Sequence, residues 1–379
     1  MSSLKEIINN YSPNASLAQA STIPSTWYTD ERIFELEKQT VFSRSWHFAA
    51  RADQFSKPGD FATTEIAGEP IALARGSDNI LRGFFNVCRH HAAAVMTEAE
   101  GSVTQMRCPY HGWTYSLEGE LKGTPDFSGV CNFDRKEHGL VSIKTATWEK
   151  WVFVKLTGEH SPPRDESTNN LEDFIGSDLI GQVRGLNLEN LHWFERRHYT
   201  LNCNWKVFVD NYLDGGYHVP HLHKGLDSVL DYSNYKIEVG KRFCLQWSPI
   251  VVKGADDEVS AARTGRYALY YWLYPNFMIN YYDGVMDTNL VVPLGIDKTE
   301  VVFDFYFADV SDEARERNAA SIDVGQKIQN EDVAICESVQ RGLKSRAYHE
   351  GRLSVRREGG EHLFHRLLHS DLITGLDHK

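Results

Sequence analysis

Two short stretches that each hold one cysteine and one histidine constrain this chain most. They read Cys88-Arg89-His90 and Cys108-Pro109-Tyr110-His111, so the pattern is C-x-H, seventeen residues, then C-x2-H. Thiolate and imidazole are ligands that soft and borderline transition metals prefer in proteins. Within each stretch the two side chains are close enough in sequence to reach one metal centre. The pattern therefore predicts a metal site that two loop tips hold jointly.

Two kinds of metal centre take two cysteines and two histidines. Structural zinc binds such ligands tetrahedrally at ~2.0–2.3 Å, but zinc fingers usually group cysteine with cysteine and histidine with histidine. Here each stretch offers one of each, which favours a [2Fe–2S] cluster with two cysteines on one iron and two histidines on the other, the Rieske arrangement. We therefore predict such a cluster with the ligands Cys88, His90, Cys108 and His111. The neighbouring His91 is expected to face solvent or to support a ligand.

Length and composition indicate what surrounds this centre. With 379 residues, of which 41% are hydrophobic, the chain has room for two or three domains at ~150 residues each. A net charge of −12 argues against nucleic acid and anionic membranes as partners, and it permits a cationic substrate. No apolar run approaches the ~20 residues of a membrane span, and the N-terminal stretch lacks the apolar core of a signal peptide. We expect a cytoplasmic protein, or a stromal one if a chloroplast transit peptide has been removed.

Turn residues and periodicity divide the chain into two kinds of structure. Short strands at 61–66, 70–75, 81–87, 114–116 and 151–155 are typical of a small all-β domain. The polar stretch 159–169, with its double proline, predicts a linker. Helical spacing occurs at 30–41, 204–213 and 311–343, the last of which is one helix or two. β-like patterns occur at 267–282, 288–292 and 300–307. The second half is therefore expected to be α+β, with an antiparallel sheet beside helices.

Residues 204–226 predict a second metal site. This stretch contains three histidines and two acids: His218, His221, His223, Asp210 and Asp214. Two imidazoles and one carboxylate form the facial triad of non-haem Fe(II) oxygenases, which leaves positions open for O2 and substrate. We expect His218 and His223 to be ligands, with His221 as the alternative. Asp210, Asp214 and His218 share one helical face at i, i+4 and i+8, so either acid can support a ligand histidine.

The third ligand should be a carboxylate far along the chain. Asp332, within the predicted helix 311–343, is the best candidate, and Glu331 and Glu337 are its rivals. Periodicity alone does not choose among them, because a charged helix face is usually just solvated.

Taken together, the two Cys/His stretches, the NWK…DNY…YH…H segment and the ED-x-x-ICESVQRGL helix resemble the Rieske non-haem iron oxygenases of the α-subunit type. The resemblance spans about 40–345. It implies an all-β Rieske domain at 41–160 and a helix-grip catalytic domain at 161–379, on which an N-terminal segment, 1–40, packs. It also implies the four cluster ligands named above, and a mononuclear Fe(II) held by His218, His223 and Asp332. Members work as homo-oligomers, a trimer or a multiple of it.

In that family an acid bridges the cluster of one subunit to the iron of the next. Most members carry it three residues before the first iron histidine, but this chain has Gly215 there and its acid one residue earlier, at Asp214. The bridge is therefore expected to be Asp214 through an altered turn, or Asp210 from one helical turn back.

The segment DNYLDGGYHVPHLHKGL is most similar to plant-type choline monooxygenases, and the aromatic stretch 270–277 is also similar to carnitine and glycine betaine oxygenases. A quaternary ammonium ion offers no N–H donor, so aromatic faces must bind it, at ~0.5–2 kcal/mol per contact. The candidates are Trp272, Tyr274, Tyr281 and Tyr282. The alternative is that alternate members of this set fill the sheet core.

The resemblance implies a monooxygenase that takes electrons from a ferredoxin or a flavin reductase and uses O2 to convert choline into betaine aldehyde hydrate. One alternative keeps the enzyme class and changes the substrate to another N-methylated compound, which loses a methyl group, or to an aromatic ring. The other is an electron carrier or a zinc scaffold. The second His/Asp group argues against that last alternative, because a carrier needs no facial triad.

Overall fold

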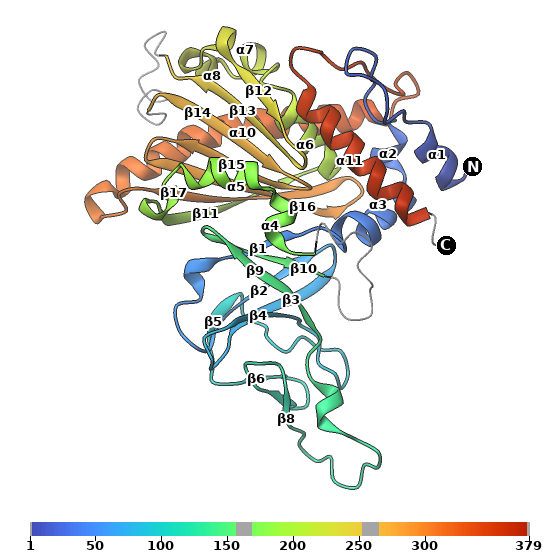
Figure 1. The fold of residues 1–379 in the computed structure, drawn as a ribbon, viewed down its shortest axis with the longest axis vertical. Helices are drawn as coiled ribbons and strands as arrows, with labels where there is room; N and C mark the ends of the chain where they lie inside the picture. The colour runs from blue at the N-terminus through green and yellow to red at the C-terminus, as the bar shows by residue number, and fades with distance from the viewer. Residues whose placement is uncertain (1, 157–168, 252–264, 377–379) are drawn as a thin grey trace. The chain divides into compact units, whose positions relative to one another are not determined.

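The computed structural model describes residues 2–156, 169–251 and 265–376. These residues form two compact units, Phe42–Phe174 and the combination of Met1–Val41 with Ile175–Lys379. The linker predicted at 159–169 lies outside the described residues except for Asn169, and so does the predicted domain boundary at 160/161. Figure 1 labels the elements of both units.

The unit Phe42–Phe174 is built from antiparallel strands. Seven of its described strands form one sheet in the order β1-β10-β9-β4-β3-β2-β5, and three short strands form a second, β6-β7-β8. The strands are β1 (His47–Arg51), β2 (Asp60–Ile66), β3 (Glu69–Arg75), β4 (Leu81–Phe85), β5 (Glu100–Ser102), β6 (Met106–Arg107), β7 (Thr114–Tyr115), β8 (Leu121–Gly123), β9 (Ser142–Trp148) and β10 (Trp151–Lys155).

Strand β3 shows how this unit forms two cores. Side chains alternate between the two faces of a strand. Ile71 and Leu73 pack with Val152 and Val154 on one face, while Ala72 and Ala74 belong to the cluster around Trp113 on the other. The second core lies beneath the two Cys/His stretches, so it supports them.

The other unit contains a seven-stranded antiparallel sheet, counted over the residues that the structure describes, in the order β11-β17-β16-β15-β14-β13-β12. The strands are β11 (His192–Leu201), β12 (Lys236–Val239), β13 (Phe243–Pro249), β14 (Tyr267–Leu273), β15 (Phe277–Tyr282), β16 (Val285–Gly295) and β17 (Lys298–Phe307). The predicted β-like stretch 267–282 is thus two strands joined by a turn. Both predicted strands at 288–292 and 300–307 belong to longer ones.

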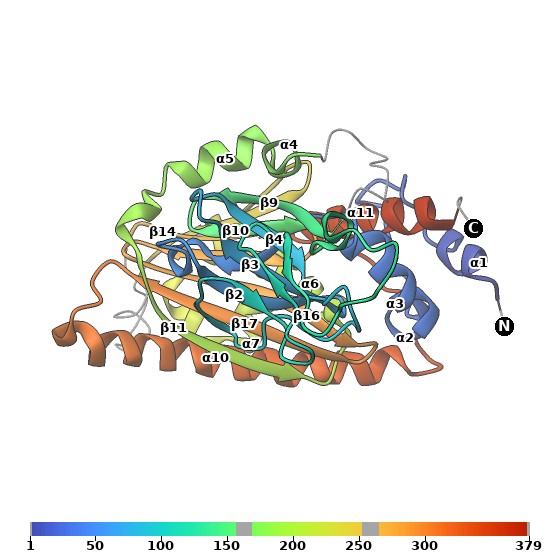
Figure 2. The ribbon, with the colours of Figure 1, turned by 90° about the horizontal axis from the view of Figure 1, so that it is seen from below.

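Helices accompany the strands, and most of them belong to this second unit. They are α1 (Leu4–Asn9), α2 (Thr26–Thr29), α3 (Glu31–Glu37), α4 (Leu171–Ile175), α5 (Ser177–Arg184), α6 (Trp205–Leu213), α7 (Val219–Leu222), α8 (Lys224–Val229), α10 (Arg315–Leu343) and α11 (Gly359–Leu376). Helix α10 is one continuous helix of 29 residues, and Figure 2 shows it running along the sheet. Helix α11 packs on α6, where the rings of Phe364 and Trp205 lie 5.5 Å apart.

Helix α6 has a defined start and a buried anchor. The side chain of Asn204 accepts a hydrogen bond from the backbone N–H of Lys206 and so caps the helix. The Nζ of Lys206 lies 2.6 Å from the carboxylate of Glu37, and both side chains are fully buried. Trp205 donates to the same carboxylate. Losing one partner of a buried ion pair leaves an uncompensated charge, so the pair holds the N-terminal segment in place on α6.

The fold class predicted from the sequence, an all-β Rieske domain followed by an α+β catalytic domain with an antiparallel sheet, is confirmed. Within the described ranges, no helix combines the length and the apolar character that crossing a membrane requires.

Candidate active site

The two Cys/His stretches form a pair of loops that meet at their tips. One follows β4 and is closed by two backbone hydrogen bonds: Cys88 N–H donates to the carbonyl of Ala93, and Ala92 N–H donates to the carbonyl of Cys88. The other lies between β6 and β7, where Cys108 N–H donates to the carbonyl of Trp113. Gly112 has a φ of +72°, a backbone conformation that glycine adopts without strain. The rings of His90 and Trp113 stack, with 4.7 Å between centroids.

The four predicted cluster ligands divide into a buried pair and an outer pair. Cys88 and Cys108 are 3% and 2% exposed. His90 and His111 lie nearer the surface, with their Nδ1 atoms 3.2 Å apart. His91 is exposed, and its ring contacts that of His90. A centre held this way has its sulfur ligands in the core and its imidazole ligands toward solvent, where an electron can leave.

The same loops discriminate between one metal ion and two. Tetrahedral zinc needs its ligand atoms gathered around a single point. Two sulfur ligands and two nitrogen ligands held as separate pairs fit a diiron unit better than a single zinc ion.

In the other unit, His218, His223 and Asp332 converge. Their ligand atoms lie within 4.8 Å of one another. The Nε2 of His223 is 3.0 Å from Asp332 Oδ1, and the Nε2 of His218 is 4.0 Å from the same oxygen. The histidines flank the short helix α7, and the acid comes from α10. This donor set of two imidazoles and one carboxylate fits a non-haem Fe(II) site.

Each member of this triad has a supporting partner. Asp214 accepts a hydrogen bond from the Nδ1 of His218, and Glu331 accepts one from the Nδ1 of His223 at 2.6 Å. Asn211 donates to Asp332 at 2.9 Å. A carboxylate on Nδ1 leaves Nε2 as the metal-binding nitrogen of each ring. Glu331, a rival for the third ligand, thus contacts His223, one of the predicted ligands, instead of joining the group itself.

The remaining candidates lie elsewhere. Glu337 accepts hydrogen bonds from the backbone and side chain of Asn202, and His221 is exposed. Asp210 has different partners. Tyr28 donates a hydrogen bond to it at 2.6 Å, and His365 donates one at 3.0 Å.

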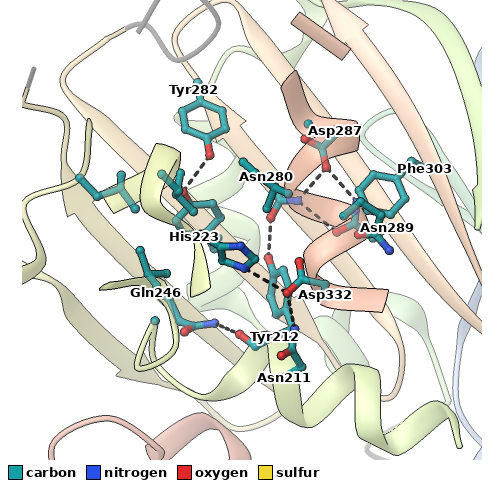
Figure 3. A pocket seen from close by; sticks show the side chains of 18 of the residues that line it. Asn211, Tyr212, His223, Gln246, Asn280, Tyr282, Asp287, Asn289, Phe303 and Asp332 are labelled. Carbon is teal, nitrogen blue, oxygen red and sulfur yellow. Dashed lines mark hydrogen bonds and ion pairs between the residues drawn. The ribbon is translucent and has the colours of Figure 1, made fainter. Parts of the chain in front are cut away.

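A pocket adjoins the triad between the sheet and helices α6 and α10. Its cavity volume is about 140 Å³. His218, His223 and Asp332 line it, and Tyr and Phe side chains make up about a third of its lining. Aromatic side chains from four strands and from α6 contribute: Tyr199, Phe208, Tyr212, Tyr270, Tyr282, Phe303, Phe305 and Phe307. Figure 3 shows His223 and Asp332 facing the ring of Tyr212, with Tyr282 farther along the wall.

Of the four aromatic residues predicted to bind substrate, Tyr282 lines this pocket. Its neighbour Tyr281 points to the opposite face of β15, where its hydroxyl donates to Leu186, because successive strand residues alternate. Trp272 is fully buried and packs against Phe364 of α11. The hydroxyl of Tyr274 donates to Asp371, outside the pocket lining. Trp272, Tyr274 and Tyr281 therefore pack in the core or support the sheet instead of lining the pocket.

The sequence analysis missed a polar cluster in the pocket wall. Asp287 on β16 accepts hydrogen bonds from Asn280 at 2.7 Å and from Asn289 at 2.8 Å. Tyr212 in turn donates to Asn280. The available signal was the D-x-N pattern at 287 and 289, because polar residues two apart in an otherwise apolar strand share one face.

Both units match known protein families. Residues 45–134 match the family model of the Rieske [2Fe-2S] domain, and residues 188–372 match that of the ring hydroxylating alpha subunit (catalytic domain). Choline monooxygenase, chloroplastic, of Arabidopsis thaliana is 40% identical over 377 residues, which cover 98% of this chain and 88% of that protein. The carnitine monooxygenase oxygenase subunit of Escherichia coli K12 is 30% identical, covering 93% and 92%.

Solved structures agree with these matches. The quaternary ammonium Rieske monooxygenase CntA in complex with L-carnitine superimposes with a TM-score of 0.78 at 27% identity, covering 95% of this chain and 96% of that one. Naphthalene 1,2-dioxygenase from Rhodococcus, at 19% identity and a TM-score of 0.77, shares the fold. The chain therefore belongs to the Rieske non-haem iron oxygenases with a ring-hydroxylating α-subunit catalytic domain.

Proposed function

We propose that this oxygenase converts choline into betaine aldehyde hydrate. The reaction consumes choline, O2, two electrons and two protons, and it yields the gem-diol and one water; the gem-diol then loses water to give the aldehyde. Its family membership makes this protein a Rieske-type monooxygenase with a [2Fe–2S] cluster and a mononuclear iron, which acts on quaternary ammonium substrates. The pocket of about 140 Å³ is the observation on which the choice of a small cationic substrate rests.

Size and wall chemistry support that choice. A cavity of ~150 Å³ holds one benzene molecule, so about 140 Å³ suits a molecule of choline's size and not a fused aromatic ring. The hydroxyls of Tyr270 and Tyr282 lie 2.8 Å apart, which fixes both rings in the wall. Such rings attract a quaternary ammonium ion through their negatively polarised faces.

We assign the metal ligands accordingly. Cys88, His90, Cys108 and His111 hold the cluster, and His218, His223 and Asp332 hold the mononuclear iron. When bound, the cluster supplies single electrons and the mononuclear iron supplies O2 activation. The residues of this chain orient these groups. Asp214 and Glu331 fix the tautomers of the two histidines.

Electrons must come from an external donor, as they do throughout the family. We propose a ferredoxin or a flavin reductase as the donor, a homotrimer or a multiple of it as the assembly, and Asp214 as the bridge between a neighbour's cluster and the iron. The plant relatives are described as chloroplastic, which supports the stroma over the cytoplasm and ferredoxin as the donor.

Substrate-dependent O2 uptake tests the proposal. The metal-loaded protein with a generic reductase is given choline, glycine betaine, L-carnitine and benzoate in turn, and the products are identified. We expect uptake with choline, a stoichiometric aldehyde and no formaldehyde. His218→Ala, which removes an iron ligand, is the control for uptake that does not depend on the site. Uptake with benzoate and none with choline would rule out the proposed substrate.

A second candidate is oxidation of carnitine or a similar N-methylated acid, with loss of a fragment or a methyl group. The carnitine monooxygenase subunit at 30% identity and the carnitine-bound structure favour it. Formaldehyde or trimethylamine among the products, together with faster uptake on L-carnitine than on choline, would select it.

A further inference from the structure

One face of helix α10 borders the pocket and carries an inference about how the substrate is oriented. Five residues of this helix line the cavity: Ser321, Gly325, Ile328, Gln329 and Asp332. Their spacing of i, i+4, i+7, i+8 and i+11 is that of one helical face. Asp332 belongs to the group of three that would hold the iron. Gln329 therefore lies in the same wall of the pocket, about one helical turn before a proposed iron ligand.

Gln329 has a buried amide group without an acceptor. It is 4% exposed, and its Nε2 has no hydrogen-bond partner within the described part of the chain. Four other amide side chains line the pocket, and each donates to an acceptor of the protein: Asn211, Gln246, Asn280 and Asn289. Figure 3 shows these hydrogen bonds. A buried N–H group without an acceptor costs free energy, so among these five amides Gln329 is the one that a ligand would satisfy.

An alcohol is the ligand group that suits this amide. A side-chain amide offers N–H donors and a carbonyl acceptor, and a hydroxyl group meets either with a single oxygen. Neither group carries a charge, so the pair is buried without a counter-ion. The methyl groups of a trimethylammonium ion offer no acceptor. The alcohol end of choline is therefore the part of the molecule that Gln329 fits.

The place of Gln329 in the wall also gives the substrate a direction. The proposed reaction oxidises the carbon that carries the hydroxyl. A donor about one helical turn from Asp332 holds the hydroxyl oxygen at the end of the pocket where the iron ligands lie, and so brings that carbon toward the iron site. The trimethylammonium group then lies among the Tyr and Phe rings of the wall, which attract it.

We propose that Gln329 binds the hydroxyl oxygen of the substrate through its side-chain N–H and so selects quaternary ammonium compounds that carry an alcohol. A site built to bind a hydroxyl disfavours the analogue that lacks it, because the buried donor is then left unpaired. The inference rests on the proposed function and extends it from a compound to the residue that orients it.

A thermodynamic cycle on the hydroxyl tests this assignment. The ligand pair is choline and ethyltrimethylammonium, which keeps the cation and has hydrogen in place of the hydroxyl. The protein pair is the metal-loaded enzyme and its Gln329→Met variant, whose side chain has a similar length and no N–H. Calorimetry without reductant, so that no turnover occurs, gives the four dissociation constants. The unmodified enzyme should bind choline about 3- to 10-fold more tightly than ethyltrimethylammonium. In Gln329→Met this ratio should fall to about one, with ethyltrimethylammonium bound within about twofold of the unmodified enzyme.

Turnover gives the second arm of the test. The KM for choline should rise about 3- to 10-fold in Gln329→Met. Less of the consumed O2 should appear as aldehyde, because the carbon to be oxidised is no longer held in place. A structural defect that only lowers the fraction of active enzyme leaves the aldehyde formed per O2 unchanged, so this yield separates the two roles.

Gln340→Met is the matched control. Gln340 lies on the same helix, is 2% exposed and also has an Nε2 without a partner in the described part of the chain. It is not among the described residues that line the pocket, and its Oε1 accepts a hydrogen bond from the backbone N–H of Asn204. This variant should lower the thermal midpoint, and it should leave the affinity ratio and the aldehyde yield per O2 as they are in the unmodified enzyme.

The outcomes separate this inference from the proposed function. If no N-methylated compound supports O2 uptake by the unmodified enzyme, the proposed function fails. If choline is oxidised but Gln329→Met weakens choline and ethyltrimethylammonium equally, the function stands and the role of Gln329 is overturned. Gln329→Leu serves the same cycle if the methionine variant does not fold. The unmodified enzyme alone is also decisive, because ethyltrimethylammonium binding as tightly as choline overturns the inference.

Discussion

At the scale of single residues, two acids one helical turn apart have different surroundings. Asp214 accepts from the Nδ1 of His218, whereas Asp210 accepts from Tyr28 and His365. Both lie on the same face of one helical stretch, so the sequence alone did not distinguish between them as the bridging acid. Helices α2 and α11 pack against α6 and distinguish the two acids. They supply the donors Tyr28 and His365 to Asp210, and neither donor reaches Asp214.

Asp214→Asn therefore should slow electron delivery to the mononuclear iron by about 10- to 100-fold, while the visible bands of the cluster stay unchanged. Stopped-flow reoxidation of the reduced cluster in the presence of choline and O2 measures the rate. Asp210→Asn is the comparison, with a rate close to that of the unmodified enzyme and a lower unfolding temperature. If Asp210→Asn slows the transfer and Asp214→Asn does not, the assignment of the bridge is wrong.

Glu361 on α11 predicts a pH dependence of stability. Burial first, and then the charges of Asp210, Glu358 and Asp214, raise its pKa well above 4.5, and the Nε2 of His365 lies 3.8 Å from its carboxylate. The folded state therefore keeps a proton that the unfolded state loses above pH 4.5, so stability from this group falls as pH rises through the folded-state pKa.

Glu361→Gln removes this dependence. Relative to the unmodified protein, its thermal midpoint should be similar near pH 4.5 and higher by roughly 2–4 °C near pH 8. Thermal scans of the loaded protein across this range give the two curves. A difference that stays constant with pH would mean that Glu361 does not hold a proton in the fold.

At the scale of elements, the turn between α6 and α7 positions His218, one of the two proposed iron-binding histidines. Gly215 and Gly216 have φ values of +69° and +68°, which end α6 and redirect the chain. A Cβ on Gly215 would lie 2.2 Å from the backbone oxygen of Arg357. Side chains are disfavoured at such φ values, so this turn both needs glycine and packs too tightly for alanine.

Gly215→Ala should therefore displace His218. We expect iron content close to two atoms per chain, those of the cluster, instead of three, with normal visible bands and no O2 uptake. Metal analysis by mass spectrometry measures the loss. Gly181→Ala is the control, because Gly181 lies within helix α5 with open space around its Cα, and alanine there should raise stability slightly.

At the scale of the whole molecule, the chain divides its chemistry between two units. Residues Phe42–Phe174 are contiguous and contain two hydrophobic cores of their own. The catalytic unit combines the two ends of the chain, and Glu37 and Lys206 join them through a buried pair. The cluster unit alone is therefore expected to fold without its partner.

A protein consisting of residues 42–174 should bind two irons and show the visible bands of a [2Fe–2S] centre without substrate-dependent O2 uptake. Absorption and metal content are the measurements, and Cys108→Ser in the same fragment should abolish the bands. A fragment that folds, as judged by circular dichroism, yet binds zinc in place of iron would contradict the diiron assignment.

Sequence patterns predicted the strands that frame the cluster loops and the long helix α10, because turn residues and period-two or period-3.6 spacing are local. They did not indicate α11, whose Phe364 covers Trp272 and keeps it out of the pocket. Nor did they indicate the contact of Asp287 with Asn280, which lies opposite it across a strand pairing. Local spacing does not reveal contacts between residues distant in sequence, so neither the packing of Phe364 on Trp272 nor the pairing of Asp287 with Asn280 followed from it.

What the sequence by itself determined is the chemistry of the metal sites. Coordination restricts both the residue types and their spacing, so Cys88, His90, Cys108 and His111 could be proposed as cluster ligands before any fold was known. The tertiary structure decided which way each remaining side chain faces. It brought Asp332 to the histidines while Glu331 became a support, because the rotation of α10 about its own axis is fixed by packing on the sheet and not by the charges along its surface.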